Sequence, residues 1–129
     1  MRKIVVSVQN GLLAEAITQM LSESGEFQPF RVPVSGRKSE LLAQCEMLQT
    51  LTMIAEVSYA SGTTIDTRLA EAKQLRKALP DCKIVLLCDE NTAPELAREV
   101  MLAKKDGWID GFFYSSVTAK YLLAALTAL

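Results

Sequence analysis

The sequence contains no histidine, and this absence narrows the chemistry open to the protein. Histidine-based catalytic triads, most zinc sites and histidine proton relays are excluded. The three cysteines, Cys45, Cys82 and Cys88, lack the spacing of metal ligands, so we expect reduced thiols. No nucleophile–base pair and no phosphate-cradling loop is present either. We therefore expect no enzyme activity, no metal and no cofactor, and a small flavodoxin-like enzyme is the least favoured alternative.

Long hydrophobic runs and concentrated positive charge are also lacking. No apolar run approaches the roughly 18 residues needed to cross a bilayer. The first residues, Met1 to Ile4, lead directly into a strand-like run without a signal-peptide pattern. The net charge is −1, with Lys and Arg scattered among acids, so the basic face typical of nucleic-acid binding is missing. We expect a soluble, cytoplasmic chain that enters no membrane and does not itself bind nucleic acid.

What the chain does have is a regular alternation of strand-like and helix-like segments over 129 residues, the length of one domain. β-branched and apolar runs predict buried strands at 3–8, 53–57, 82–88 and 108–114, and a run with two prolines predicts an edge strand at 27–34. Apolar residues at helical spacing predict helices over 12–21, 40–49, 65–79, 93–104 and 117–129. Ser39 is the candidate N-cap of the second helix, and Thr92 with Glu95 is the candidate capping box of the fourth.

Strands and helices that alternate in this way form a parallel sheet with right-handed crossovers and helices on both faces. We therefore predict an α/β fold, a flavodoxin-like (βα)5 three-layer sandwich, with residues 1–129 as one domain. The proline-containing second strand fits the edge of a sheet of order 2-1-3-4-5. In this order the carboxyl ends of the central strands come together near Val8-Gln9, Glu56 and Cys88-Asp89. Open α/β sheets bind ligands at that edge.

The segment Asp110-Gly111-Phe112-Phe113-Tyr114-Ser115-Ser116-Val117-Thr118, with Leu122 to Leu126 after it, resembles the end of the receiver domain of bacterial two-component response regulators. The order of elements resembles this family over nearly the whole chain. The resemblance implies an acidic pair after the first strand and a phosphoacceptor aspartate at the end of the third. In the family these hold Mg²⁺ and accept a phosphoryl group from a histidine kinase, while a hydroxyl residue ends the fourth strand and a lysine ends the fifth.

None of these functional residues is kept in this sequence. The acidic pair falls on Val8 and Gln9, the phosphoacceptor on Glu56, the hydroxyl residue on Cys88, the lysine on Ser115 and the aromatic switch residue on Phe112. Mg²⁺ requires hard oxygen ligands, and only Glu56 offers a carboxylate here. Asp89 falls where the family has a small residue, and its charge would repel an incoming phosphate.

Glu56 is the only charge between Glu46 and Asp66, and it ends an apolar strand. A carboxylate in that place is costly to desolvate unless water, a cation or hydrogen-bond donors meet it. One interpretation is a built-in mimic of the phosphorylated state. The interpretation that we favour is an acid paired with Gln9, Asn10 or solvent, because the family's lysine and hydroxyl residue, which would respond to such a charge, are missing. For Cys88 we favour an inert core thiol over an oxidant sensor.

The final helix carries apolar side chains around most of its circumference, with Lys120 as its only charge. Such a helix is expected to pack against another subunit or an adjoining domain. We predict a surface made of Tyr114, Tyr121, Leu122 and Leu126.

The prediction for function is an atypical, phosphorylation-independent receiver domain that acts as an interaction or dimerisation module. The resemblance implies the N-terminal part of a DNA-binding transcriptional regulator, which contacts nucleic acid only through a domain outside this chain. The partner is then a second copy or an adjoining output domain. The alternative is a ligand-sensing α/β module with a small polar pocket at the strand ends, made by Gln9, Asn10, Glu56, Cys88 and Ser115.

Overall fold

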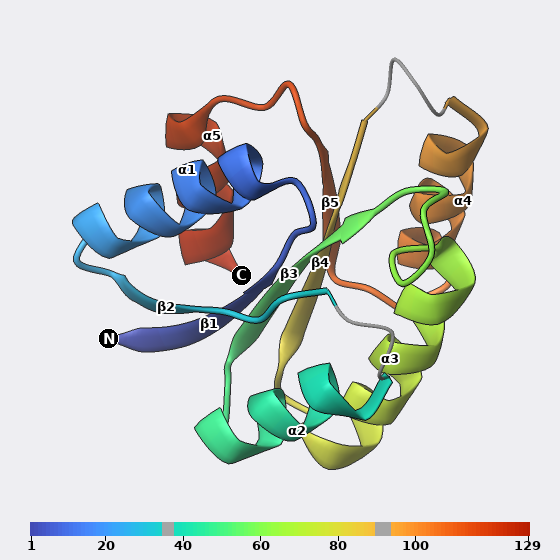
Figure 1. The fold of residues 1–129 in the computed structure, drawn as a ribbon, viewed down its shortest axis with the longest axis horizontal. Coiled ribbons are helices and arrows are strands. Elements are labelled where there is room, and N and C mark those ends of the chain that lie inside the picture. The colour runs from blue at the N-terminus through green and yellow to red at the C-terminus, as the bar shows by residue number, and fades with distance from the viewer. Residues whose placement is uncertain (35–37, 90–93) are drawn as a thin grey trace.

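The computed structural model describes residues 1–34, 38–89 and 94–129, in which five strands and five helices alternate (Figure 1). The elements are β1 (Arg2–Ser7), α1 (Gly11–Glu23), β2 (Phe27–Arg31), α2 (Lys38–Leu48), β3 (Thr52–Val57), α3 (Ile65–Ala78), β4 (Lys83–Cys88), α4 (Pro94–Lys105), β5 (Gly111–Tyr114) and α5 (Ala119–Ala128). The predicted element order is therefore confirmed. No helix within the described ranges has both the length and the apolar character to cross a bilayer.

The five strands form one parallel sheet in the order β2-β1-β3-β4-β5, as the sequence predicts. Ile54 of β3 lies at the centre and pairs with Val6 on one side and Val85 on the other. β2 lies at the edge, where Pro29 pairs with Ile4 without having to donate a hydrogen bond to a further strand. This order brings the carboxyl ends of β1, β3 and β4 side by side.

Helices cover both faces of the sheet, as Figure 1 shows: α1 and α5 lie on one face, and α2, α3 and α4 lie on the other. Two apolar clusters fill the two interfaces. On the first face, Ile17 and Leu21 of α1 pack with Ile54 and Val85 of the sheet. On the second, Leu75 and Val100 pack against the opposite side of the same strands. Strands buried on both faces explain the continuous apolar runs in the sequence.

Several predicted boundaries are wrong in position. β2 ends at Arg31 rather than at residue 34. β5 begins at Gly111 rather than at Trp108, because the Asp110 carboxylate accepts a 2.8 Å hydrogen bond from the Ile84 amide where strand pairing would otherwise start. α5 begins at Ala119 because the Thr118 hydroxyl caps it. Ser39 already lies inside α2, which begins at Lys38, so it is not the N-cap. The predicted capping box cannot be placed, because Thr92 lies outside the described residues.

Candidate functional site

The carboxyl ends of β3, β4 and β5 border a small hollow of about 110 Å³. Its lining residues are Asn10, Leu13, Glu56, Val57, Ser58, Leu87, Cys88, Asp89 and Ser115. The predicted convergence of the strand ends is thus present, and we call this space the polar hollow. Val8 and Gln9 do not line it: Val8 is buried in the core between α1 and the sheet, and Gln9 is exposed.

Glu56 holds the turn that connects β1 to α1. Its Oε1 accepts hydrogen bonds from the main-chain N–H groups of Gln9, at 2.8 Å, and of Asn10, at 3.4 Å. The Asn10 side chain in turn accepts a 3.1 Å hydrogen bond from the Leu13 amide and so caps α1. The carboxylate therefore meets hydrogen-bond donors, which is the pairing with Gln9 and Asn10 that the sequence favours, and the contacts are to the main chain.

Arg68 is the residue of this site that sequence reasoning missed. It belongs to α3 and is only 1% exposed. Its Nε donates to the Glu56 carbonyl at 2.8 Å and one terminal nitrogen donates to the Ser7 carbonyl at 3.0 Å, so one guanidinium connects the ends of β3 and β1. The available signal was the spacing of Ile65, Arg68, Ala72 and Leu75, which places Arg68 on the buried stripe of the helix.

Arg68 also forms an ion pair with Glu71, which lies one turn further along α3. The second terminal nitrogen of Arg68 lies 3.1 Å from Glu71 Oε1, and both side chains are buried. Burial raises the pKa of Glu71 above its ordinary value, although the Arg68 charge acts in the opposite direction. This ion pair supports the strand ends from the face of the sheet opposite to α1.

The three cysteines are free thiols in the core. Burial is the main cause that raises the pKa of Cys45 to about 12 and that of Cys82 to about 11. Cys88 lies at the end of β4 with 1% of its surface exposed. Buried thiols with raised pKa are poor nucleophiles and poor metal ligands.

The predicted interaction surface needs a correction. Leu122 and Leu126 are 3% and 0% exposed, because they are the residues through which α5 packs on the sheet and α1. They belong to the core and cannot form a surface of the folded chain. Tyr114 and Tyr121 are exposed by 37% and 64%, and the Tyr121 ring is supported edge-on by Phe113, with the ring centroids 6.3 Å apart. The exposed part of the predicted surface is therefore aromatic.

No family model and no curated protein matches the sequence. Solved structures do match over nearly the full length of this chain. The CheY-like protein TadZ of Pseudomonas aeruginosa superposes with a TM-score of 0.74 at 16% identity, covering 99% of this chain and 98% of that one. Chemotaxis protein CheY4 of Vibrio cholerae gives 0.73 at 19% identity, covering 99% and 98%. A LuxR-family DNA-binding response regulator of Staphylococcus aureus gives 0.74 at 13% identity, covering 99% and 98%.

The chain has the fold of a response-regulator receiver domain. At these identities the likeness shows the fold alone, so the chemistry of the site has to be judged from its own residues. The receiver fold is associated with Mg²⁺, and the residues present do not fit that ion. Val8 is apolar and buried, Oε1 of Glu56 already accepts two main-chain N–H groups, and within the described ranges no three His, Cys, Asp or Glu side chains gather into a metal site.

Proposed function

We propose that this chain is a degenerate member of the receiver family that works through protein–protein contact, without phosphorylation. The observation that carries the proposal is the position of Glu56, whose carboxylate is engaged by the β1–α1 turn where the family has a phosphoacceptor. A carboxylate that already accepts two N–H groups is a poor nucleophile toward phosphorus. Without Mg²⁺ ligands, the charge of an incoming phosphoryl group would also remain unneutralised.

Association is proposed through the face around Tyr114 and Tyr121. Aromatic side chains are enriched at protein interfaces because they combine a large apolar area with few rotatable bonds. We further propose that the chain is cytoplasmic and is the N-terminal part of a DNA-binding transcriptional regulator. The receiver fold occurs in the two-component response regulator RcsB, solved in a complex with DNA, where the match covers 98% of this chain and 59% of that one.

Sedimentation velocity at several protein concentrations tests this proposal. We expect self-association that acetyl phosphate and Mg²⁺ leave unchanged and that Tyr121→Lys weakens. Tyr59→Lys is the matched control, because Tyr59 is 66% exposed and belongs to the β3–α3 loop rather than to β5 or α5. A strict monomer at all concentrations would contradict homodimerisation, and association that appears only with acetyl phosphate would contradict phosphorylation independence.

A ligand-sensing module remains the second candidate because the polar hollow is present. It places Glu56 and Asp89 carboxylates beside Ser58, Asn10 and Ser115. A thermal-shift screen with metabolites tests this candidate, which requires at least one compound that raises the melting temperature of the wild-type protein and not that of a Ser115→Trp variant. A screen without any such compound would contradict it.

A further inference from the structure

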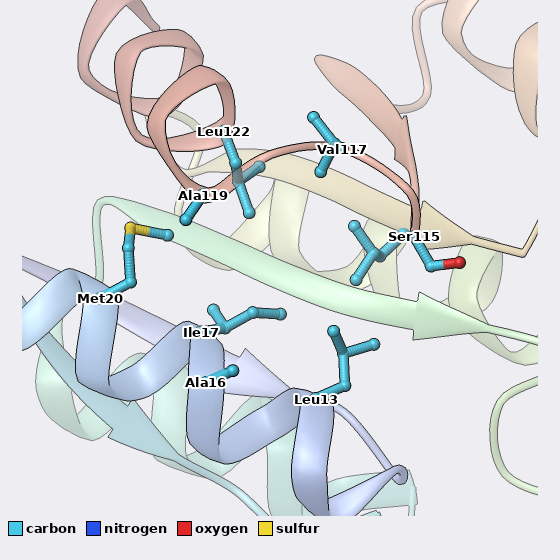
Figure 2. A pocket seen from close by; sticks show the side chains of 9 residues that line it. Leu13, Ala16, Ile17, Met20, Ser115, Val117, Ala119 and Leu122 are labelled. Atoms are coloured by element: carbon cyan, nitrogen blue, oxygen red, sulfur yellow. The ribbon is translucent and has the colours of Figure 1, made fainter.

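A second hollow, which we call the apolar hollow, lies between α1 and α5 (Figure 2). It measures about 110 Å³ and is lined by Leu13, Ala16, Ile17, Met20, Leu87, Ser115, Val117, Ala119 and Leu122. Among the described residues, every side chain that lines this hollow is apolar except that of Ser115. Figure 2 shows Met20 at one end of this hollow and Ser115 with Leu13 at the other, with the Ser115 hydroxyl directed away from Met20.

The two hollows adjoin, because Leu13, Leu87 and Ser115 line both of them. The combined space is apolar between the helices and carries the carboxylates of Glu56 and Asp89 at the strand ends. No Lys or Arg is among the described residues that line either hollow. Arg68 lies on α3, on the opposite face of the sheet from α1 and α5 (Figure 1), and its guanidinium is directed to the main-chain carbonyls of Glu56 and Ser7 and to the Glu71 carboxylate rather than to the Glu56 carboxylate.

We infer that the combined space is one binding site for a small organic cation, an amine with a short apolar body. This inference rests on the ligand-sensing candidate above and specifies its ligand. The apolar hollow approaches the size of cavities of about 150 Å³ that stay dry and bind benzene. An ionised carboxylate has about four lone-pair sites. Glu56 uses two of them for the Gln9 and Asn10 amides and can accept from an ammonium group with the rest.

The charge of the site also defines what it rejects. A carboxylate or phosphate ligand would place like charges together in a partly desolvated space, which is unfavourable. A neutral apolar molecule fills the apolar hollow but offers no ammonium group to the Glu56 carboxylate. An amine without an apolar body pairs with the carboxylate but leaves the apolar side chains facing water.

Titration of the ¹⁵N-labelled protein with three matched compounds tests the inference by NMR. Butylamine carries both features and is protonated at pH 7, as the lysine side chain is with its pKa of about 10.4. Butan-1-ol lacks the charge, and methylamine lacks the apolar body. We expect butylamine to shift the amides of Gln9, Asn10, Leu13 and Ser115 with a dissociation constant about tenfold lower than either control compound. Equal binding of butylamine and either control, or no saturable shift at these amides, would overturn the inference.

Two variants with matched controls identify the site. Ala16→Leu fills the apolar hollow, and Ala70→Leu adds the same side chain on the exposed face of α3. Glu56→Gln removes the charge of the site and keeps an oxygen that can accept the Gln9 amide. Its control, Glu46→Gln, removes a charge at an exposed position of α2. We expect Ala16→Leu and Glu56→Gln each to weaken the binding of butylamine about tenfold. The two control variants should leave the affinity for butylamine unchanged.

The outcomes also separate this inference from the candidate function on which it rests. If butylamine does not bind but the metabolite screen finds a Ser115-dependent ligand, the chemical class inferred here is wrong and the ligand-sensing candidate stands. If neither binds, both are wrong. If butylamine binds equally to the wild type and to Ala16→Leu, the apolar hollow is not part of the site, which overturns the inference.

Discussion

The guanidinium of Arg68 donates a 2.8 Å hydrogen bond to the main-chain carbonyl of Glu56. The Glu56 carboxylate in turn accepts a hydrogen bond from the Gln9 amide. Glu56 therefore links the buried Arg68 guanidinium on α3 to the turn that precedes α1. The end of β3 is thus fixed from both faces of the sheet. Such an arrangement stabilises a single geometry at the strand ends, in the place where the receiver family has its phosphorylation chemistry.

Replacing Arg68 with methionine is expected to destabilise the protein by about 3–5 kcal/mol, because it leaves a buried carboxylate without its partner. The double variant Arg68→Met/Glu71→Leu is expected to recover most of that loss, since the unpaired charge is then absent. Urea unfolding followed by circular dichroism measures both. Arg98→Met, at an exposed position of α4, is the control and should stay within about 0.5 kcal/mol of the wild type. Equal losses for Arg68→Met and the control would contradict the role of the guanidinium.

The pH dependence of stability should report Glu71. Burial raises the pKa of Glu71 in the folded state above its ordinary value of 4.5, so the folded state binds the proton more tightly than the unfolded state does. Its contribution to stability is therefore fully present below pH 4.5 and is lost as the pH rises through the folded-state pKa. We expect the unfolding free energy of the wild type minus that of Glu71→Gln to fall with rising pH in this window. A difference that grows with pH would contradict the raised pKa.

Removal of the Glu56 side chain should loosen the start of α1. Glu56→Ala loses the acceptor for the Gln9 and Asn10 amides and is expected to cost about 1 kcal/mol, as for a lost helix cap. Hydrogen exchange at these two amides should become faster, while Glu56→Gln should keep most of the protection at Gln9. Unchanged exchange in Glu56→Ala would show that the contact does not hold the turn.

The thiols should be unreactive in the folded protein. With pKa values raised to about 12 for Cys45 and about 11 for Cys82, the thiolate fraction at pH 8 is negligible, and burial also blocks access. We expect no colour with Ellman's reagent under native conditions and three equivalents per chain in denaturant, one for each cysteine of the sequence. One rapidly reacting thiol in the native protein would revive the sensor interpretation of Cys88.

The fold was predictable because its signals are local and mutually consistent. β-branched runs mark strands buried on both faces, as in Val5 and Val6, and Pro29 places β2 at an edge. The boundaries of the last elements were not predictable from apolar periodicity, since they depend on single polar contacts. Asp110 replaces a strand hydrogen bond at the start of β5, and Thr118 caps α5.

The site was predictable in position and less so in composition. Parallel topology places Glu56, Cys88 and Ser115 at one edge of the sheet, and this follows from element order alone. Arg68 was missed because a charged residue within a helix is normally solvated, and its burial depends on carbonyl acceptors from two strands distant in sequence. Leu122 and Leu126 were assigned to the surface because a helix sequence does not show which side of a broad apolar face meets the sheet.

The most direct test of phosphorylation independence is intact-protein mass spectrometry after incubation with acetyl phosphate and Mg²⁺. The wild type and Glu56→Asp are compared, because the variant restores the family's phosphoacceptor but not the Mg²⁺ ligands. We predict that both masses stay unchanged. A phosphoryl adduct on residue 56 of the wild type that depends on Mg²⁺ would contradict it.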